Sequence, residues 1–195
     1  VTMGDPRKFR ATYDRPSHPW QEERLAMEKP LVQDYGLKNK TELYKIISKV
    51  KTYTATAKRL IASTGAQADL EKQQLFAKLG KLGLIGTSTN LDDVLGLQPR
   101  DLLERRLQTM VFRKGLARSP KQARQFIAHE HIMVNGKKIT APNYLVTVAE
   151  ESMISVVPSS TLASPDHPER VPIQKKAKKP RPAPRDRRDR RGGRR

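Results

Sequence analysis

Cationic side chains recur between residues 100 and 125 at spacings that place them on shared faces of two short helices. A guanidinium group binds two oxygens of one phosphate, and an ammonium group offers a compact point charge. Singly, each of these charges is more often a solvated surface group, but together they predict one surface that binds phosphates flanking a helical junction. The residues expected to form it are Arg106, Arg113, Lys114, Arg118, Ser119, Lys121, Gln122, Arg124 and Gln125.

Two other basic groups extend this expectation. Lys137 and Lys138 follow an Asn-Gly turn, and residues 1–20 form an arm interrupted by three prolines. In the arm, Phe9, Tyr13 and Trp20 alternate with cations, a composition that suits phosphate contact together with stacking of rings on RNA bases. A frayed terminus is the alternative explanation. The cations of the arm are Arg7, Lys8, Arg10 and Arg15.

Other kinds of chemistry find little support in the sequence. His129 and His131 make a lone His-x-His pair without a third ligand, so no metal site is expected. The glycines of residues 78–83 lack the spacing of a phosphate-binding loop, and Asp92-Asp93 reads best as the acidic first turn of a short helix. The absence of cysteine removes thiolate zinc sites and cysteine nucleophiles. We therefore expect no catalytic residue, no cofactor and no enzyme activity.

The charge balance points to a polyanionic partner. Lys and Arg outnumber Asp and Glu by 39 to 20, a formal charge of +19, and so large an excess usually persists because a polyanion neutralises it. No apolar run approaches the ~20 residues of a membrane-crossing helix, and neither a signal peptide nor a complete myristoylation start is expected. Nucleic acid is thus favoured over a membrane.

Residues 165–195 are predicted to form a disordered basic tail. Within 170–195, 13 basic residues stand against two acidic ones, among several prolines. Such a segment buries too little apolar surface to offset its ordering entropy. Its net +11 leaves +8 on residues 1–169, so the rest of the chain is basic without the tail.

Residues 21–97 are predicted to form a helical body that follows the arm. Pro30 is expected to end or kink a first helix that starts near Gln21. A second helix follows a capping-box pattern in which Glu42 is the third residue after Asn39, and Gly65 is expected to end it. A third helix is expected near 67–82. The apolar stripes of these two helices are Leu43, Ile46, Ile47, Val50, Tyr53, Ala57, Leu60 and Ile61, then Leu70, Leu75, Phe76, Leu79 and Leu82.

Residues 98–164 are predicted to form a second domain. One helix is expected over 100–114, with Gly115 ending it, and another begins at Ser119-Pro120. Strands are expected at 132–134 and 137–139 around the Asn135-Gly136 turn, then at 144–148 and 153–157. The predicted fold class is α+β: a mostly helical N-terminal body, then two helices packed on a small antiparallel or mixed sheet.

This pattern resembles a known RNA-binding module. The order and spacing of residues in three segments are similar to the S-four RNA-binding domain, and the wider chain, over about 3–160, resembles ribosomal protein four of the small subunit in its archaeal and eukaryotic cytosolic form. The usual bacterial residues, Asp in place of Gln108 and Gly in place of Glu130, are absent, as is any zinc-binding cysteine cluster. The segments are 104–119, 122–125 and 131–136, supported by 3–7, 35–40 and 91–95.

The resemblance implies a structural protein of the cytoplasmic ribosome. It would bind the five-prime domain of small-subunit rRNA, nucleate subunit assembly and contribute to translational accuracy near the mRNA entry and decoding region. Small-subunit ribosomal proteins three and five would be its neighbours.

Two alternatives remain open at this stage. An RNA-modifying enzyme would need a catalytic domain beside the module, and residues 1–97 show no acid–base cluster. Two helices joined through Gly115 are also typical of a DNA-binding helix-turn-helix protein. The strands that follow and the basic tail, however, fit RNA better. Binding to a structured RNA junction and to duplex DNA at equal salt separates RNA from DNA binding.

Overall fold

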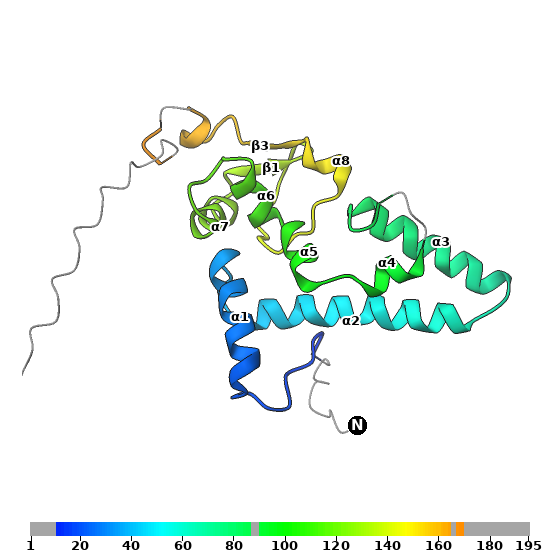
Figure 1. Cartoon of the computed structure of the whole chain (residues 1–195). Helices are drawn as coiled ribbons and strands as arrows, with labels where there is room; N and C mark the ends of the chain where they lie inside the picture. Colours follow the sequence, from blue (N-terminus) through cyan, green and yellow to red (C-terminus); the bar gives the residue numbers. More distant parts are fainter. Residues whose placement is uncertain (1–10, 87–89, 165–166, 170–195) are drawn as a thin grey trace, which may run out of the picture.

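A computed structural model describes residues 11–86, 90–164 and 167–169, in which helices predominate and a small sheet lies near the C-terminal end (Figure 1). The cations Arg7, Lys8 and Arg10 lie outside these residues, as does the tail expected at 165–195 apart from residues 167–169. The elements are α1 (Glu22–Asp34), α2 (Lys40–Ala62), α3 (Ala66–Lys81), α4 (Leu91–Leu95), α5 (Pro99–Glu104), α6 (Leu107–Arg113), α7 (Pro120–Ala128), β1 (Ile132–Val134), β2 (Lys137–Lys138), α8 (Val148–Glu151), β3 (Ile154–Val156) and the 3-10 helix η1 (Thr161–Ala163).

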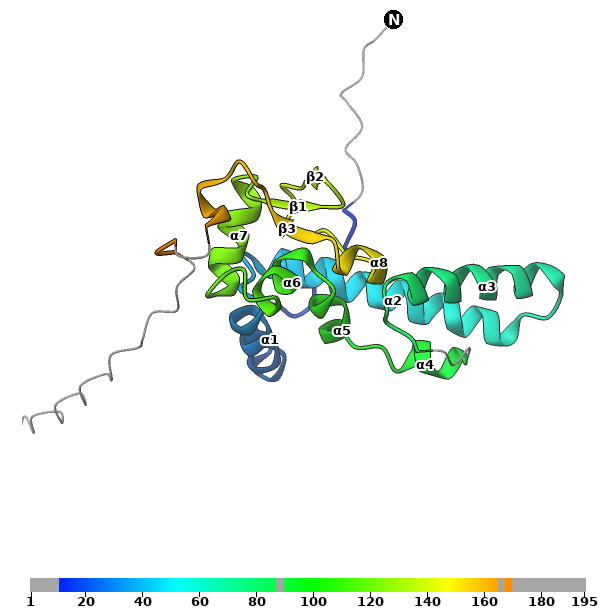
Figure 2. The same cartoon turned by 90° about the horizontal axis from the view of Figure 1, so that it is seen from above.

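The N-terminal half is organised around α2, the longest helix. α3 returns along it, and α4 and α5 pack on it as well (Figures 1 and 2). The apolar stripe predicted for α2 supplies a large share of this core, with Leu43, Ile46 and Leu60 almost completely buried. Not every residue of the stripes predicted for α2 and α3 lies in the core, however, because Ile61 and Leu70 are about half exposed.

The C-terminal half packs α6 and α7 against a three-stranded antiparallel sheet of order β2-β1-β3. Ile132 and Val134 of β1 pair with Val156 and Ile154 of β3. Leu107, Val111 and Ile127 join these strands in a second apolar core, separate from the first. The predicted α+β class is confirmed, and the sheet is antiparallel.

The hairpin between β1 and β2 forms as the sequence predicts. Asn135 and Gly136 both have positive φ, 49° and 74°, which a two-residue type I′ turn requires. Glu130, just before β1, also has a positive φ of 62°. Glycine adopts this conformation without strain, so a glycine would also suit this position.

Two predicted elements of the C-terminal half are wrong. The single helix expected over 100–114 is divided into α5 and α6, because Arg106 is extended and forms a β-bridge with Leu145. Around it, the N–H of Leu107 donates to the carbonyl of Tyr144 at 2.8 Å. The segment expected as a strand at 144–148 contributes only that bridge. It then turns into α8, which Thr147 caps by accepting from the N–H of Glu150.

The helix ends of the N-terminal half also differ from expectation. α1 continues through Pro30 to Asp34, so of the two expected effects of Pro30, ending or kinking the helix, the first does not occur. α2 begins where predicted, but the Asn39 side chain makes no capping hydrogen bond. α2 then ends at Ala62, and Gly65, with φ 126°, precedes α3 as its N-cap residue. α3 itself matches the prediction.

Candidate nucleic-acid interface

Exposed cations gather on the C-terminal half at the ends of α6, on α7 and on the hairpin. Lys121 and Gln125 are exposed on α7, and Lys137 is exposed on β2. Within the described part of the chain, neither Lys121 nor Lys137 has an ion-pair partner, whereas Lys138 lies 3.8 Å from Glu130. Two ammonium groups are therefore available to an external anion.

Ser119 positions the start of α7. Its Oγ accepts from the N–H of Gln122 at 3.2 Å, and the Gln122 side chain accepts from the N–H of Arg118 at 2.8 Å. Gln122 also donates to a carboxylate oxygen of Glu169 at 2.7 Å. An open hollow of about 520 Å³ is lined by polar and charged residues, and this composition suits a polar ligand. They are Arg118, Ser119, Lys121, Gln122, Gln125 and Glu169.

Arg106 corrects the sequence analysis, which expected it on the exposed surface. Its side chain is 0% exposed, and its Nη2 donates to Oε2 of Glu42 at 2.9 Å. Burial lowers the pKa of Arg106, and the Glu42 hydrogen bond offsets part of that effect. Thr109 is also buried, and its hydroxyl donates to the carbonyl of Leu103. Arg106 therefore cannot serve as a surface phosphate ligand.

Glu42 binds two arginines at once. Besides Arg106 it accepts from Arg124, whose side chain is 23% exposed, and Arg124 also donates to Oε1 of Gln108 at 3.3 Å. Burial raises the pKa of Glu42, but the hydrogen bonds from Arg124 and Arg106 outweigh it, so the pKa lies below its usual range. The sequence analysis missed this function of Glu42, because its only local signal was the spacing from Asn39.

Gln108 completes the contact between the two halves. Its amide nitrogen donates to the carbonyls of Tyr35 at 3.2 Å, Gly36 at 3.0 Å and Pro120 at 2.9 Å. Gly36 permits this approach, because a Cβ there would lie 2.8 Å from Cβ of Pro120, and its φ of 58° favours glycine as well. The Glu42–Arg106–Arg124–Gln108 cluster, called the polar lock below, thus joins α2 and the turn after α1 to α6 and α7.

The remaining predicted cations are partly occupied by contacts within the protein. Arg113 is exposed and pairs with Glu104 at 2.9 Å. Burial raises the pKa of Glu104, but hydrogen bonds from Arg113 and Tyr35 hold it below its usual range. Lys114 donates to the carbonyl of Glu151. Arg118 is half-buried, and its Nε has no hydrogen-bond partner among the described residues.

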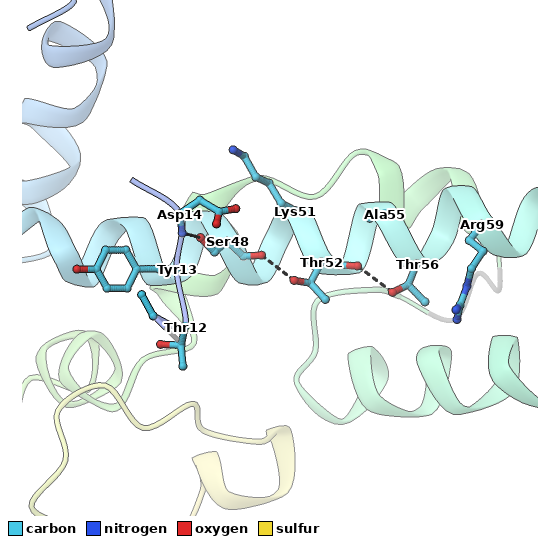
Figure 3. Close-up of a pocket in the computed structure, with 10 residues that line it drawn as sticks. Thr12, Tyr13, Asp14, Ser48, Lys51, Thr52, Ala55, Thr56 and Arg59 are labelled. Carbon is cyan, nitrogen blue, oxygen red and sulfur yellow. Dashed lines mark hydrogen bonds between the residues drawn. The ribbon is translucent and has the colours of Figure 1, made fainter. Parts of the chain in front are cut away.

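The described part of the N-terminal arm lies along α2. The N–H of Asp14 donates to Oγ of Ser48 at 3.0 Å, and Thr52 and Thr56 turn their hydroxyls back to helix carbonyls at 2.9 Å (Figure 3). Beside this contact, residues of the arm and of α2 line an open hollow of about 610 Å³. Arg15 is exposed, and Trp20 is 88% exposed. Both side chains therefore remain accessible.

The described residues contain neither a cluster of metal ligands nor a membrane-spanning helix. No group of three or more potential metal ligands occurs in ranges 11–86, 90–164 and 167–169, and His131 instead shares a 2.8 Å hydrogen bond with Ser160. No helix there has the length and apolar character needed to cross a membrane.

A family profile and similar known proteins point to the same family. The S4 domain profile matches residues 105–152, which contain α6, α7 and the hairpin. The chain is 53% identical over 176 residues to small ribosomal subunit protein uS4 of Methanococcus aeolicus, covering 90% of this chain and 99% of the relative. Two Methanococcus maripaludis proteins of the same name are 52% identical over 170 residues, covering 87% of this chain and 96% of each relative. The chain belongs to the uS4 family of small ribosomal subunit proteins.

Proposed function

We propose that this protein binds small-subunit rRNA through the exposed cations of α6, α7 and the hairpin. Family membership makes it a structural, rRNA-binding constituent of the small ribosomal subunit and not an enzyme. The observation that carries the choice of surface is that Lys121 and Lys137 are exposed without an ion-pair partner among the described residues, inside the segment that matches the S4 domain. The proposed surface comprises Arg113, Lys114, Arg118, Ser119, Lys121, Gln122, Arg124, Gln125, Lys137 and Lys138.

The N-terminal arm is proposed to contribute a second contact. Arg15 is exposed, and Arg7, Lys8 and Arg10 precede it in the sequence. The exposed ring of Trp20 adds a surface on which a base can stack. Phosphate contacts from such an arm add affinity without reading the base sequence.

The finer assignments are also proposals. They are contact with the five-prime domain of the rRNA, nucleation of subunit assembly, and a contribution to translational accuracy near the mRNA entry region. Small-subunit proteins three and five are the proposed neighbours, and the cytoplasm is the proposed compartment. All rest on the resemblance described above, and the excess of basic residues is consistent with them.

A three-part organisation is proposed for the chain: an N-terminal arm and helical body at 1–97, the RNA-binding domain at 98–164 and a basic tail at 165–195. Two separate apolar cores support the division into a helical body and an RNA-binding domain. Leu102 and Leu103 of α5 pack in the first core, and Leu107 of α6 packs in the second. The physical boundary between the cores therefore falls within the α5–α6 junction.

The test is a binding titration of the full chain with small-subunit rRNA and, at equal salt, with duplex DNA. We expect the rRNA to bind more tightly, with a log–log salt slope of about −0.7 to −0.9 per phosphate contact. The double variant Lys121→Gln/Lys137→Gln should bind rRNA more weakly and with a slope shallower by about 2, or about 1 per lost contact. Equal affinity for DNA, or a flat salt profile, would contradict the proposal.

A further inference from the structure

A cleft of about 490 Å³ opens between the two halves of the molecule, and none of the residues of the surface proposed above lines it. Residues of α2 and α3 with Leu82 line one wall, and the segment just before α8 lines the other; Figure 2 shows the backbone of these elements. Its volume falls in the ~300–1,000 Å³ range of ligand pockets. The residues on which the argument rests are Lys49, Tyr53, Lys78, Lys81, Leu82 and Leu145.

Three lysines surround the cleft opening. Lys49 of α2 and Lys78 and Lys81 of α3 are all exposed, and none has an ion-pair partner in the described part of the chain. The Lys78 ammonium lies 5.4 Å from the centroid of the Tyr53 ring. No Asp or Glu lines the cleft, so the local charge is positive and available to an anion.

The interior of the cleft is mainly apolar. Tyr53 is nearly buried, and Leu82 and Leu145 are half-buried. The two walls meet just beyond Leu82, where a Cβ on Gly83 would lie only 2.8 Å from Cγ2 of Val148. The turn after α3 therefore lies directly against the start of α8 at one end of the cleft.

We propose that this cleft takes the base of one unpaired rRNA nucleotide, with the flanking phosphates on Lys49, Lys78 and Lys81. A nucleotide combines the two properties that the cleft requires, a flat apolar ring and adjacent negative charge. Proteins that recognise single-stranded RNA use the same combination of apolar contact with a base and cations along the backbone. The inference rests on the proposed function, since it presumes rRNA binding, but it concerns a different surface.

The charge of the cleft is tested with matched double variants of the full chain. Lys78→Gln/Lys81→Gln removes two cleft cations, and Lys29→Gln/Lys58→Gln removes two exposed lysines of α1 and α2 that do not line the cleft. The probe is small-subunit rRNA. We expect the cleft variant to have the shallower salt slope, by about 1 per lost phosphate contact. Equal slopes for the two variants overturn the inference.

The base-binding part is tested by filling the cleft while keeping its lysines. Leu82→Trp should lower rRNA affinity by about fivefold to hundredfold, the range for loss of one stacked base. Leu70→Trp, on the exposed side of α3, should leave the affinity unchanged. Melting curves for both variants separate a binding loss from unfolding. Unchanged affinity in folded Leu82→Trp overturns the inference.

Ultraviolet crosslinking identifies the occupant directly. In reconstituted subunits, we expect nucleotide adducts on peptides that contain Tyr53 or Leu82. Crosslinks from these peptides to an acidic segment of another ribosomal protein, without a nucleotide, would overturn the inference and leave rRNA binding by the α7 surface intact. Failure of the wild-type chain to bind rRNA would instead overturn the proposed function.

Discussion

Glu42 shows most clearly how a single residue joins the two halves. The carboxylate sits in the first turn of α2 but accepts from Arg106 and Arg124, which are 64 and 82 residues away in the sequence. Removing one member of a buried ion pair leaves the other charge desolvated and unpaired, which costs far more than an exposed pair contributes. The Arg106 side chain is fully buried, and its one hydrogen bond among the described residues is to Glu42, so its charge would be left unpaired.

We expect Glu42→Gln to lower the free energy of unfolding by about 3–5 kcal/mol, because neutral glutamine leaves the Arg106 charge uncompensated. Urea denaturation of the purified chain measures this. The control is Glu71→Gln, which removes the partner of exposed Arg59 and should cost less than about 1 kcal/mol. Similar losses of unfolding free energy for the two variants would mean that the Glu42 ion pairs stabilise the fold no more than a surface ion pair does.

The same carboxylate predicts a pH dependence. The arginines hold the pKa of Glu42 below its usual range in the folded state, so its stabilising effect is present above the ordinary value of about 4.3 and is lost as pH falls through the folded-state pKa. The difference in unfolding free energy between wild type and Glu42→Gln should therefore be constant near neutral pH and shrink below about pH 4. Urea titrations of both proteins across this pH range measure this difference. If the difference in unfolding free energy grew on acidification, the predicted direction of the pH dependence would be contradicted.

At the scale of elements, the backbone between α5 and α6 differs most from its local pattern. The apolar spacing of residues 103–111 suits a continuous helix, and Leu103, Leu107 and Val111 are all buried. The chain nevertheless opens at Arg106 to form a bridge with Leu145 and hydrogen bonds with Tyr144 and Val146. This junction separates the two cores, and it turns the Arg106 side chain inward to Glu42. The hairpin, in contrast, follows its local signal.

Two glycine substitutions, one in the hairpin turn and one in α3, should have opposite effects on stability. Gly136→Val should destabilise the protein by about 1–2 kcal/mol, because a side chain disfavours the left-handed conformation at φ 74°. Gly80→Ala, inside α3 with open space around its Cα, should stabilise by about 0.5–1 kcal/mol through its better helix propensity. Thermal or urea unfolding of both variants checks the signs. A neutral Gly136→Val would indicate that the turn adjusts to another type.

The described part of the chain contains two small cores, which are joined by the polar lock and by the close approach of Gly83, after α3, to Val148 of α8. Neither connection is a large apolar interface, so polar and close-packed contacts set the relative position of the halves. That position matters for binding, because the cleft needs walls from both halves, whereas the α7 surface belongs to one. Every residue of the two described cores lies between Tyr35 and Leu162.

Deleting residues 170–195 should therefore leave the melting temperature nearly unchanged, because no residue of either described core is lost. The deletion removes +11 of the +19 formal charge, so rRNA binding should weaken and its salt dependence should become shallower. Calorimetry and a salt series of binding titrations measure the two effects on the same protein. A large drop in melting temperature would mean that this segment packs on the body.

The sequence by itself determined the features that depend on near neighbours. The stripes of α2 and α3, the Ser119 start of α7 and the Asn135-Gly136 hairpin follow from periodicity, capping and turn chemistry within a few residues. The family resemblance, later confirmed, also came from local motif order. In each case the physical signal lies within one element.

Only the tertiary structure decided which charges face water. Arg106 and Arg113 looked equivalent on a helical face, yet one is buried against Glu42 and the other is exposed. Helical periodicity cannot distinguish them, because the break at Arg106 and the carboxylate it meets are set by Leu145 and Glu42, from distant parts of the chain. The same holds for the cleft, because its lysines come from α2 and α3 of the N-terminal half and its other wall, with Leu145, comes from the C-terminal half.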